Sequence, residues 1–230
     1  MHDPAPHDDA HGHDDHHDHH HDHDHGPGHA PPGDHRDPDP EIALMEAALR
    51  ELLIEKGIFT AEDIQRAIAA MEARTSARGA AVIARAWVDP DFKKALLEHA
   101  NSAVAQFGVA MGLAELTVVE NTPDTHNLIV CTLCSCYPRA LLGVPPSWYK
   151  SKAYRSRAVR EPRQVLAEFG LVLPEGVKVR VHDSTADLRF IVMPERPPGT
   201  EGWSEERLAT LVTRDSLIGV AKALDPAVAG

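Results

Sequence analysis

The first forty residues of the chain almost entirely lack the apolar side chains from which a hydrophobic core is built. They contain 13 of the 16 histidines, 11 aspartates and one arginine. Because such a segment cannot offset the entropy that folding removes, we predict that residues 1–40 are disordered. Alternating imidazoles and carboxylates bind divalent metals such as cobalt, nickel and zinc, which indicates a metal-gathering tail. The interspersed aspartates argue against an added purification tag.

The negative charge of the chain is concentrated in the same segment. The formal net charge is −12, and the 11 aspartates and one arginine of residues 1–40 account for −10, which leaves about −2 for the remainder. A nearly neutral body without a basic stripe makes nucleic acid an unexpected partner. The chain also lacks a secretory signal and an apolar run of about 18 residues, so we expect no membrane contact and a cytoplasmic location. Thiols stay reduced in that compartment.

Residues 41–108 carry the pattern of amphipathic helices. Apolar side chains recur every three or four residues from Ile42 onward. Further helix starts are indicated by the capping residue Thr60 and by Pro90, which follows an aspartate. Most apolar residues here are small, which suits packing against another chain. We therefore predict a helical arm over residues 41–108 that packs on a partner subunit, and a separate domain over residues 109–230.

The second domain shows short β-rich runs mixed with helical segments. Strands are predicted at residues 116–119, 127–130, 177–181 and 190–193, and helices at residues 160–169 and 204–212. Strands and helices do not alternate regularly, which favours an α+β fold with a mixed or antiparallel sheet.

All cysteines of the chain lie within six residues, as Cys131, Cys134 and Cys136. Cysteines retained for packing would be scattered through apolar stretches, so this concentration indicates a metal site, a redox pair or both. A structural zinc site needs a fourth ligand, for which His126 and His182 are candidates without the usual paired spacing. A redox pair of Cys131 and Cys134 would leave Cys136 unexplained. Spacing alone leaves zinc, redox chemistry and another metal open.

Main-chain amides extend the set of possible metal ligands. The segment from Cys134 to Cys136 brings the main-chain nitrogens of Ser135 and Cys136 close to the sulfurs. Three sulfurs and two nitrogens leave one position of an octahedron open. An open position distinguishes a catalytic metal from a structural one.

The sequence VCTLCSCYP at residues 130–138 resembles the metal-binding loop of the nitrile hydratase alpha subunit family, in which the gamma subunit of thiocyanate hydrolase has the same motif. The resemblance spans roughly residues 41–220 and includes VENTP (119–123), LGVPP (142–146), WYK (148–150), YRSR (154–157), REPR (160–163), LAEFG (166–170), PGTEGW (198–203) and VTRD (212–215). It implies a helical N-terminal arm followed by a layered α-β-β-α catalytic domain, within the α+β class.

The resemblance also implies one cobalt(III) ion. Cys131 would be its axial thiolate, Cys134 would be oxidised to a sulfinate and Cys136 to a sulfenate, with the main-chain nitrogens of Ser135 and Cys136 in the basal plane. The CTLC form of the loop favours cobalt over iron. The family assigns catalysis to this segment, where water or the sulfenate oxygen of Cys136 would be the nucleophile. The Ser135 hydroxyl would bond across a subunit interface, or Ser135 would serve only as a small residue.

The activity implied is hydration of small nitriles to amides by a cobalt nitrile hydratase alpha subunit. Such a subunit needs a beta subunit, which completes the pocket and supplies the arginines that face the oxidised sulfurs. A cobalt-activator chaperone is a possible further partner. A cobalt-handling protein without catalysis, suggested by the histidine-rich tail, is an alternative.

One position departs from the family pattern. Many nitrile hydratases have tryptophan and proline where this chain has Arg139 and Ala140. A cation in place of an aromatic ring favours an anionic substrate, so the gamma subunit of thiocyanate hydrolase, which converts thiocyanate to carbonyl sulfide and ammonia, is another alternative.

Several nearby side chains are expected to be structural. Trp148 and Tyr149 are predicted to pack in the core or an interface. Arg155, Arg157 and Arg160 are expected to form salt bridges within the fold or at an interface rather than to hold the oxidised sulfurs.

Overall fold

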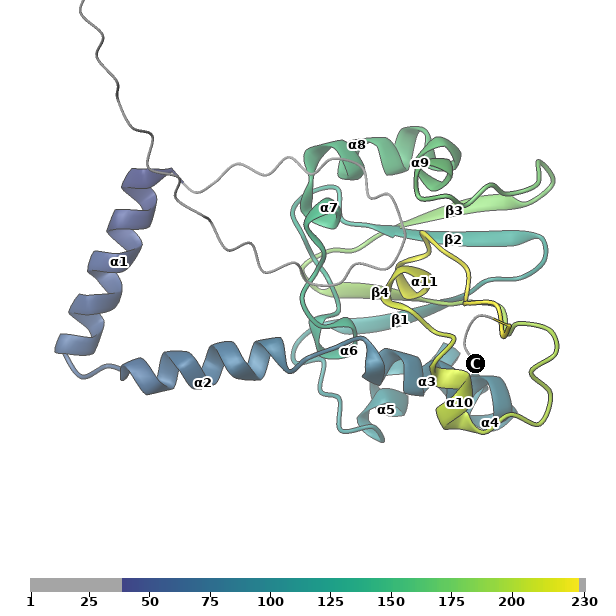
Figure 1. Ribbon diagram of the computed structural model, residues 1–230, viewed down its shortest axis with the longest axis horizontal. Helices are drawn as coiled ribbons and strands as arrows, with labels where there is room; N and C mark the ends of the chain where they lie inside the picture. The colour runs from purple at the N-terminus through teal and green to yellow at the C-terminus, as the bar shows by residue number, and fades with distance from the viewer. Residues whose placement is uncertain (1–38, 228–230) are drawn as a thin grey trace, which may run out of the picture.

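The structure of the protein is a computed structural model that describes residues 39–227. The predictions of disorder and metal binding for residues 1–40 lie outside this range, apart from Asp39 and Pro40 at the start of the first helix. Helices lie on both sides of a central group of strands, and the two N-terminal helices extend away from this body (Figure 1). No helix of the described chain has the length and hydropathy needed to cross a membrane.

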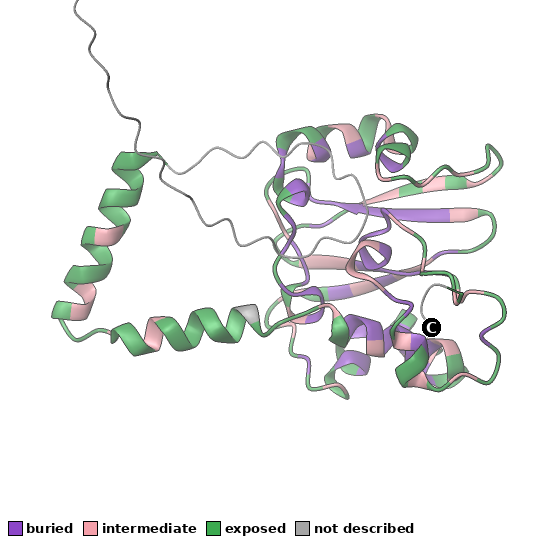
Figure 2. Cartoon of the chain, in the orientation of Figure 1, coloured by how far each residue is buried: buried purple, intermediate pink, exposed green. Residues whose placement is uncertain are grey.

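The extended helices are α1 (Pro40–Glu55) and α2 (Ala61–Glu72). Each begins at a capped residue, since Asp39 accepts from an amide of α1 and Thr60 forms a capping box at the start of α2. Their side chains remain largely exposed (Figure 2). The exposed fraction of Leu44 is 72%. Apolar side chains left on free helices indicate a surface that another protein covers.

The next three helices pack onto the body rather than extending with the first two. They are α3 (Ala77–Val88), α4 (Pro90–Glu98) and α5 (Ala100–Ala105). α3 buries Val82, Ile83 and several alanines, whose small side chains allow close approach to neighbouring elements. The small residues that suggested a partner chain are therefore used within the fold. We accordingly restrict the proposed arm to α1 and α2 instead of residues 41–108.

The four predicted strands are confirmed in position, but their pairing differs from the expectation. β1 (Glu115–Glu120) pairs in parallel with β4 (Leu188–Met193), and β2 (Thr125–Val130) pairs in parallel with β3 (Lys178–Asp183). The prediction of a mixed or antiparallel sheet is thus wrong. Each strand pairs with one far along the chain, and parallel pairs need a long crossover, which helices between residues 130 and 178 supply.

The crossover helices are α6 (Arg139–Leu142), α7 (Ser147–Lys150), α8 (Lys152–Arg160) and α9 (Pro162–Glu168). The helix predicted over residues 160–169 is confirmed as α9, which starts at Pro162, whereas α8 before it was not predicted. Helices α8 and α9 lie on one side of the strands, whereas α3, α4 and α10 (Glu205–Ala209) lie on the other (Figure 1). Helix α11 (Arg214–Ile218) contacts β2 and β4. This arrangement agrees with the predicted fold class.

Candidate metal centre

The cysteine loop begins directly after β2, where the three side chains converge. The sulfurs of Cys131 and Cys134 are 3.5 Å apart, and those of Cys134 and Cys136 are 3.2 Å apart. All three sulfurs lie within 4.8 Å of one another. Cys131 is buried, whereas Cys134 is exposed, so the group opens to one side. Three sulfur donors at this separation fit a thiophilic metal ion, while no disulfide joins them.

The thiols differ in their tendency to ionise. Hydrogen bonds from Cys136 and Cys131, followed by the main-chain amides of Ser135 and Cys136, lower the pKa of Cys134 to about 7. Desolvation, followed by the neighbouring Cys134, raises the pKa of Cys136 to about 12. The crowded sulfurs thus resist carrying three negative charges together, which a bound cation would reverse.

The loop is tied to the body at both ends. The carboxylate of Asp183, at the end of β3, accepts from the Thr132 amide at 2.9 Å and from the Thr132 hydroxyl at 2.5 Å. At the other end, the hydroxyl of buried Tyr149 donates to the Cys136 carbonyl at 2.9 Å. These bonds fix the backbone from which the sulfurs project, which restricts the positions that they can take.

The two candidate histidine ligands are engaged elsewhere. His126 is buried, and its Nε2 donates to the Gly219 carbonyl at 2.7 Å. His182 Nε2 lies 2.9 Å from the side-chain oxygen of Asn127. Within residues 39–227 the group of metal-binding side chains consists of the three cysteines alone. A zinc site completed by either histidine is therefore not supported.

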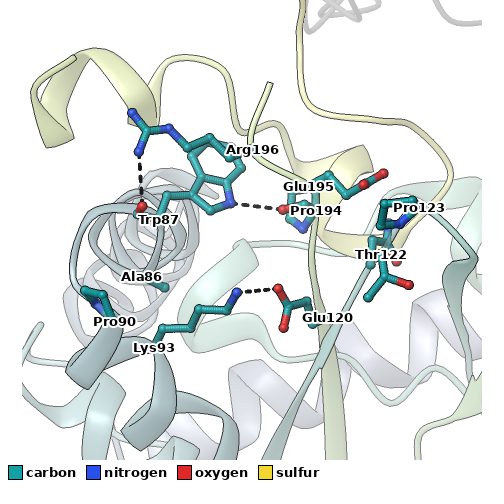
Figure 3. Close-up of a pocket in the computed structure, with 11 residues that line it drawn as sticks. Ala86, Trp87, Pro90, Lys93, Glu120, Thr122, Pro123, Pro194, Glu195 and Arg196 are labelled. Atoms are coloured by element: carbon teal, nitrogen blue, oxygen red, sulfur yellow. Dashed lines mark hydrogen bonds and ion pairs between the residues drawn. The ribbon is translucent and has the colours of Figure 1, made fainter. Parts of the chain in front are cut away.

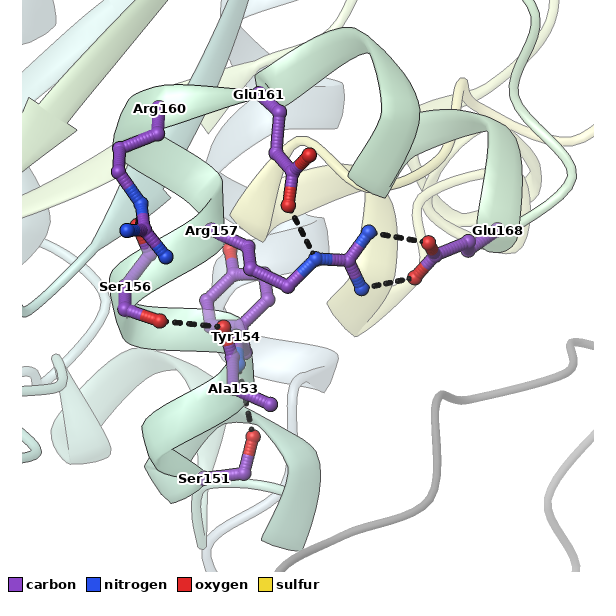
Figure 4. A network of polar contacts seen from close by, with 8 residues as sticks. All are labelled: Ser151, Ala153, Tyr154, Ser156, Arg157, Arg160, Glu161 and Glu168. Carbon is purple, nitrogen blue, oxygen red and sulfur yellow. Dashed lines mark hydrogen bonds and ion pairs between the residues drawn. The ribbon is translucent and has the colours of Figure 1, made fainter.

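All three arginines of α8 bond to groups of this chain, but within residues 39–227 only Arg157 forms the salt bridges that were expected. Arg157 binds the Glu161 carboxylate through Nε at 2.5 Å and the Glu168 carboxylate through both terminal nitrogens (Figure 4). Arg160 donates to the Ser156 carbonyl at 3.3 Å. Arg155 donates to the Thr132 carbonyl at 3.3 Å, so it supports the loop backbone.

The aromatic residues after the loop pack in the core, which confirms the sequence interpretation. Trp148 and Tyr149 are both buried. The ring of Trp148 meets those of Tyr154 and Phe169 edge to face, with centroids 4.9 and 4.7 Å away.

A pocket of about 460 Å³ opens beside the loop. Its lining includes Cys134, Ser135, Cys136, Arg74, Arg139 and Arg189. The predicted site residues Cys134, Ser135 and Cys136 therefore share one cavity, and Arg139 lines it with them. Cys131 is buried and is not among the residues that line it.

A second cavity of about 470 Å³ lies at the carboxyl ends of β1 and β4 (Figure 3). Polar groups in its wall are largely satisfied by one another. Lys93 pairs with Glu120, the Trp87 indole donates to the Pro194 carbonyl at 3.0 Å, and Arg196 donates to the Trp87 carbonyl at 3.1 Å. It contains none of the cysteines, so we place the chemistry at the loop.

Four contributors to the site were not found by sequence reasoning: Asp183, the hydroxyl of Tyr149, Arg74 and Arg189. Asp183 follows a predicted strand, and parallel pairing of that strand with β2 would have placed it beside the loop. Because a mixed or antiparallel sheet was expected, the sequence analysis did not place Asp183 beside the loop.

Comparisons with known proteins agree with this geometry. The family model "Nitrile hydratase, alpha chain" matches residues 40–221. The chain is 50% identical over 191 residues to the low-molecular weight cobalt-containing nitrile hydratase subunit alpha of Rhodococcus rhodochrous, across 82% of this chain and 92% of that protein. It is 48% identical over 193 residues to the thiocyanate hydrolase subunit gamma of Thiobacillus thioparus, across 79% of each.

A solved structure supports the same relationship. A double mutant of the Fe-type nitrile hydratase from Comamonas testosteroni Ni1 superposes with a TM-score of 0.76 at 43% identity, covering 82% of this chain and 93% of that chain. Cobalt and iron proteins therefore share this fold.

Proposed function

Since the chain belongs to the nitrile hydratase alpha-chain family, we propose that it is the metal-binding subunit of a cobalt enzyme that hydrates nitriles to amides. The observation that carries the proposal is the convergence of three cysteine sulfurs within 4.8 Å at the wall of a pocket. The chemistry of this donor set fits cobalt, and the CTLC form of the loop favours cobalt over iron.

Cys131, Cys134 and Cys136 would hold the ion through sulfur, and Ser135 and Cys136 through their main-chain nitrogens. When bound, cobalt(III) would supply Lewis acidity that polarises a nitrile. We propose that Cys134 is oxidised to the sulfinate and Cys136 to the sulfenate. The exposed position of Cys134 gives oxidants access to its sulfur.

The residues of this chain prepare the reaction by fixing the loop. Asp183 and Tyr149 hold the backbone on either side of the sulfurs, so the ligands need little reorganisation. The nucleophile that attacks the nitrile carbon would be either the sulfenate oxygen on the Cys136 sulfur or a water molecule. Ser135 lines the pocket, and its hydroxyl would hydrogen-bond to the partner chain.

The assembly proposed is a complex with a beta subunit, as a heterodimer or heterotetramer. The exposed apolar side chains of α1 and α2 support this part of the proposal. The beta subunit would complete the pocket and supply arginines to the oxidised sulfurs, and a cobalt-activator chaperone would load the metal. We also propose a cytoplasmic location for the protein, because three cysteines without a disulfide suit a reducing compartment.

The test uses the complex of this chain with its beta subunit. Mass spectrometry of the loop peptide, metal analysis and amide formation from a panel of nitriles are measured together. Cobalt, two added oxygens on Cys134, one on Cys136 and amide product are expected. Zinc with unmodified cysteines and no amide would overturn the proposal. Removal of residues 1–40 from the cobalt-loaded complex should preserve catalysis, whereas the cobalt-handling alternative predicts that this tail is essential.

Hydrolysis of thiocyanate is a second candidate, favoured by one specific observation. Arg139 lines the pocket beside Cys134 and Cys136, where a cation would attract an anionic substrate. Release of carbonyl sulfide and ammonia from thiocyanate, without amide formation from any nitrile, would select this candidate.

A further inference from the structure

The pocket beside the cysteine loop is strongly cationic. Arg74, Arg139 and Arg189 line it, and no aspartate or glutamate does. None of the three forms an ion pair with another residue in the described part of the chain. Three guanidinium groups around a small cavity outnumber the two oxidised sulfurs proposed for Cys134 and Cys136, and this positive excess raises the local concentration of anions.

The three arginines reach the pocket from separate elements. Arg139 begins α6 immediately after the loop, and its side chain is exposed. Arg189 lies on β4, where its guanidinium donates to the Thr185 carbonyl and is thereby fixed to the strand end. Arg74 lies in the linker between α2 and α3. That linker is pressed against Gly143, where an added Cβ would lie 2.1 Å from the Arg74 carbonyl oxygen.

The same cavity therefore holds two different recognition features. One wall carries the sulfurs and Ser135, where a nitrile would react, and the arginines offer sites for a negative group. Guanidinium binds carboxylate through paired hydrogen bonds, and the geometry of that pair gives specificity as well as affinity. A volume of about 460 Å³ accepts a small molecule with two such ends.

Resting on the proposed nitrile hydration, we propose that this enzyme prefers short nitriles that carry a carboxylate, such as 3-cyanopropanoate. The nitrile lies at the cysteine loop, and the carboxylate is bound by Arg139 with Arg189 or Arg74. In the reaction, the oxygen of one water molecule bonds to the nitrile carbon and both of its hydrogens end on nitrogen. The product from 3-cyanopropanoate is succinamate, whose carboxylate is unchanged.

The kinetic test compares 3-cyanopropanoate with 4-methylpentanenitrile, in which a neutral isopropyl group replaces the carboxylate. Both are assayed with the cobalt-loaded complex. We expect kcat/KM to favour the anionic nitrile, and Arg139→Gln to lower this preference about 10- to 100-fold, because a hydrogen bond to a charged group is lost. Arg139→Lys should restore part of the preference. Arg160→Gln removes an equal charge outside the pocket and should leave the preference unchanged.

A binding measurement gives a readout independent of turnover. Calorimetric titration of succinamate into the cobalt-free complex should show a Kd that Arg139→Gln weakens about tenfold or more, with Arg160→Gln as the matched control. Equal affinity in the wild type and Arg139→Gln would overturn the inference.

The outcomes separate the inference from the function on which it rests. Amide formation from 4-methylpentanenitrile at least as efficient as from 3-cyanopropanoate would overturn the anion preference and leave nitrile hydration intact. Absence of amide from every nitrile would overturn both.

Discussion

Asp183 anchors the start of the cysteine loop to the end of β3. Its two carboxylate oxygens accept from the amide and the hydroxyl of Thr132, one residue after the first metal-binding cysteine. Asparagine at this position would keep one oxygen and present an amide donor where the second acceptor was. One of the two Thr132 donors would then lose its partner.

We expect Asp183→Asn to weaken cobalt binding roughly 10- to 100-fold, the usual effect of losing a group that orients metal ligands. Cobalt titration of the metal-free complex measures this. Asp187→Asn is the control, because that carboxylate is exposed and makes no hydrogen bond in residues 39–227. Cobalt affinity that is unchanged in Asp183→Asn would contradict the anchoring role.

Two histidines that do not bind the metal should instead control stability at mildly acidic pH. Burial is the main cause that lowers the pKa of both His126 and His182 below 6.5. As the pH falls, these histidines therefore bind protons at a higher pH in the unfolded chain than in the folded chain. The free energy of unfolding is highest above pH 6.5 and falls as the pH drops below that value.

Thermal melting from about pH 7.5 to pH 5 should show this decline, and His126→Gln should reduce its slope. Carboxyls such as Asp63 and Asp89 have pKa values lowered from 3.8, so their protonation changes the free energy of unfolding only below the pH range of this experiment. A melting temperature that is independent of pH in the wild type would refute the assignment.

At the end of α11 the backbone lies very close to strand β2. Gly219 follows α11 with a φ of 90°, and a Cβ there would lie 2.0 Å from the Asn127 carbonyl oxygen in β2. This glycine is therefore required both by its backbone conformation and by the space available.

We expect Gly219→Ala to destabilise the protein more than Gly170→Ala does. Gly170 also has a positive φ, of 83°, but nothing lies within 4 Å of its added Cβ. Its replacement adds only backbone strain, roughly 1–3 kcal/mol, whereas Gly219→Ala adds steric overlap as well. Urea denaturation measures the difference in free energy of unfolding, and equal losses would contradict the close approach.

The positions of the strands were predictable from sequence, but their partners were not. Runs such as residues 127–130 identify a strand through local β-branched and apolar residues. Pairing of β2 with β3 depends instead on the path that the intervening helices give the chain. No local sequence pattern predicts that path. For the same reason the cysteine ligands were predictable from one short segment, whereas Asp183, 51 residues from Thr132, was not.

At the scale of the whole molecule, the chain divides into a body that encloses its own core and an arm that does not. α1 and α2 leave apolar side chains exposed, whereas the buried clusters begin in α3. Stability of the body should therefore depend little on the arm.

Removal of residues 1–72 should leave the melting temperature of the isolated chain nearly unchanged but abolish stable association with the beta subunit. Co-purification and size-exclusion chromatography measure the association. Removal of residues 1–38 alone is the matched control and should leave it intact. Full association of the chain that lacks residues 1–72 would contradict the role of the arm.

The parallel pairing of distant strands also sets the order in which a nascent chain can become functional. β1 and β2 leave the ribosome early, but their partners β3 and β4 follow only at residues 178–193. Until then the cysteine segment has no Asp183 to hold it, so its thiols emerge without a fixed arrangement. We therefore expect cobalt capture to be a post-translational event, which gives the cell an interval in which loading can be controlled.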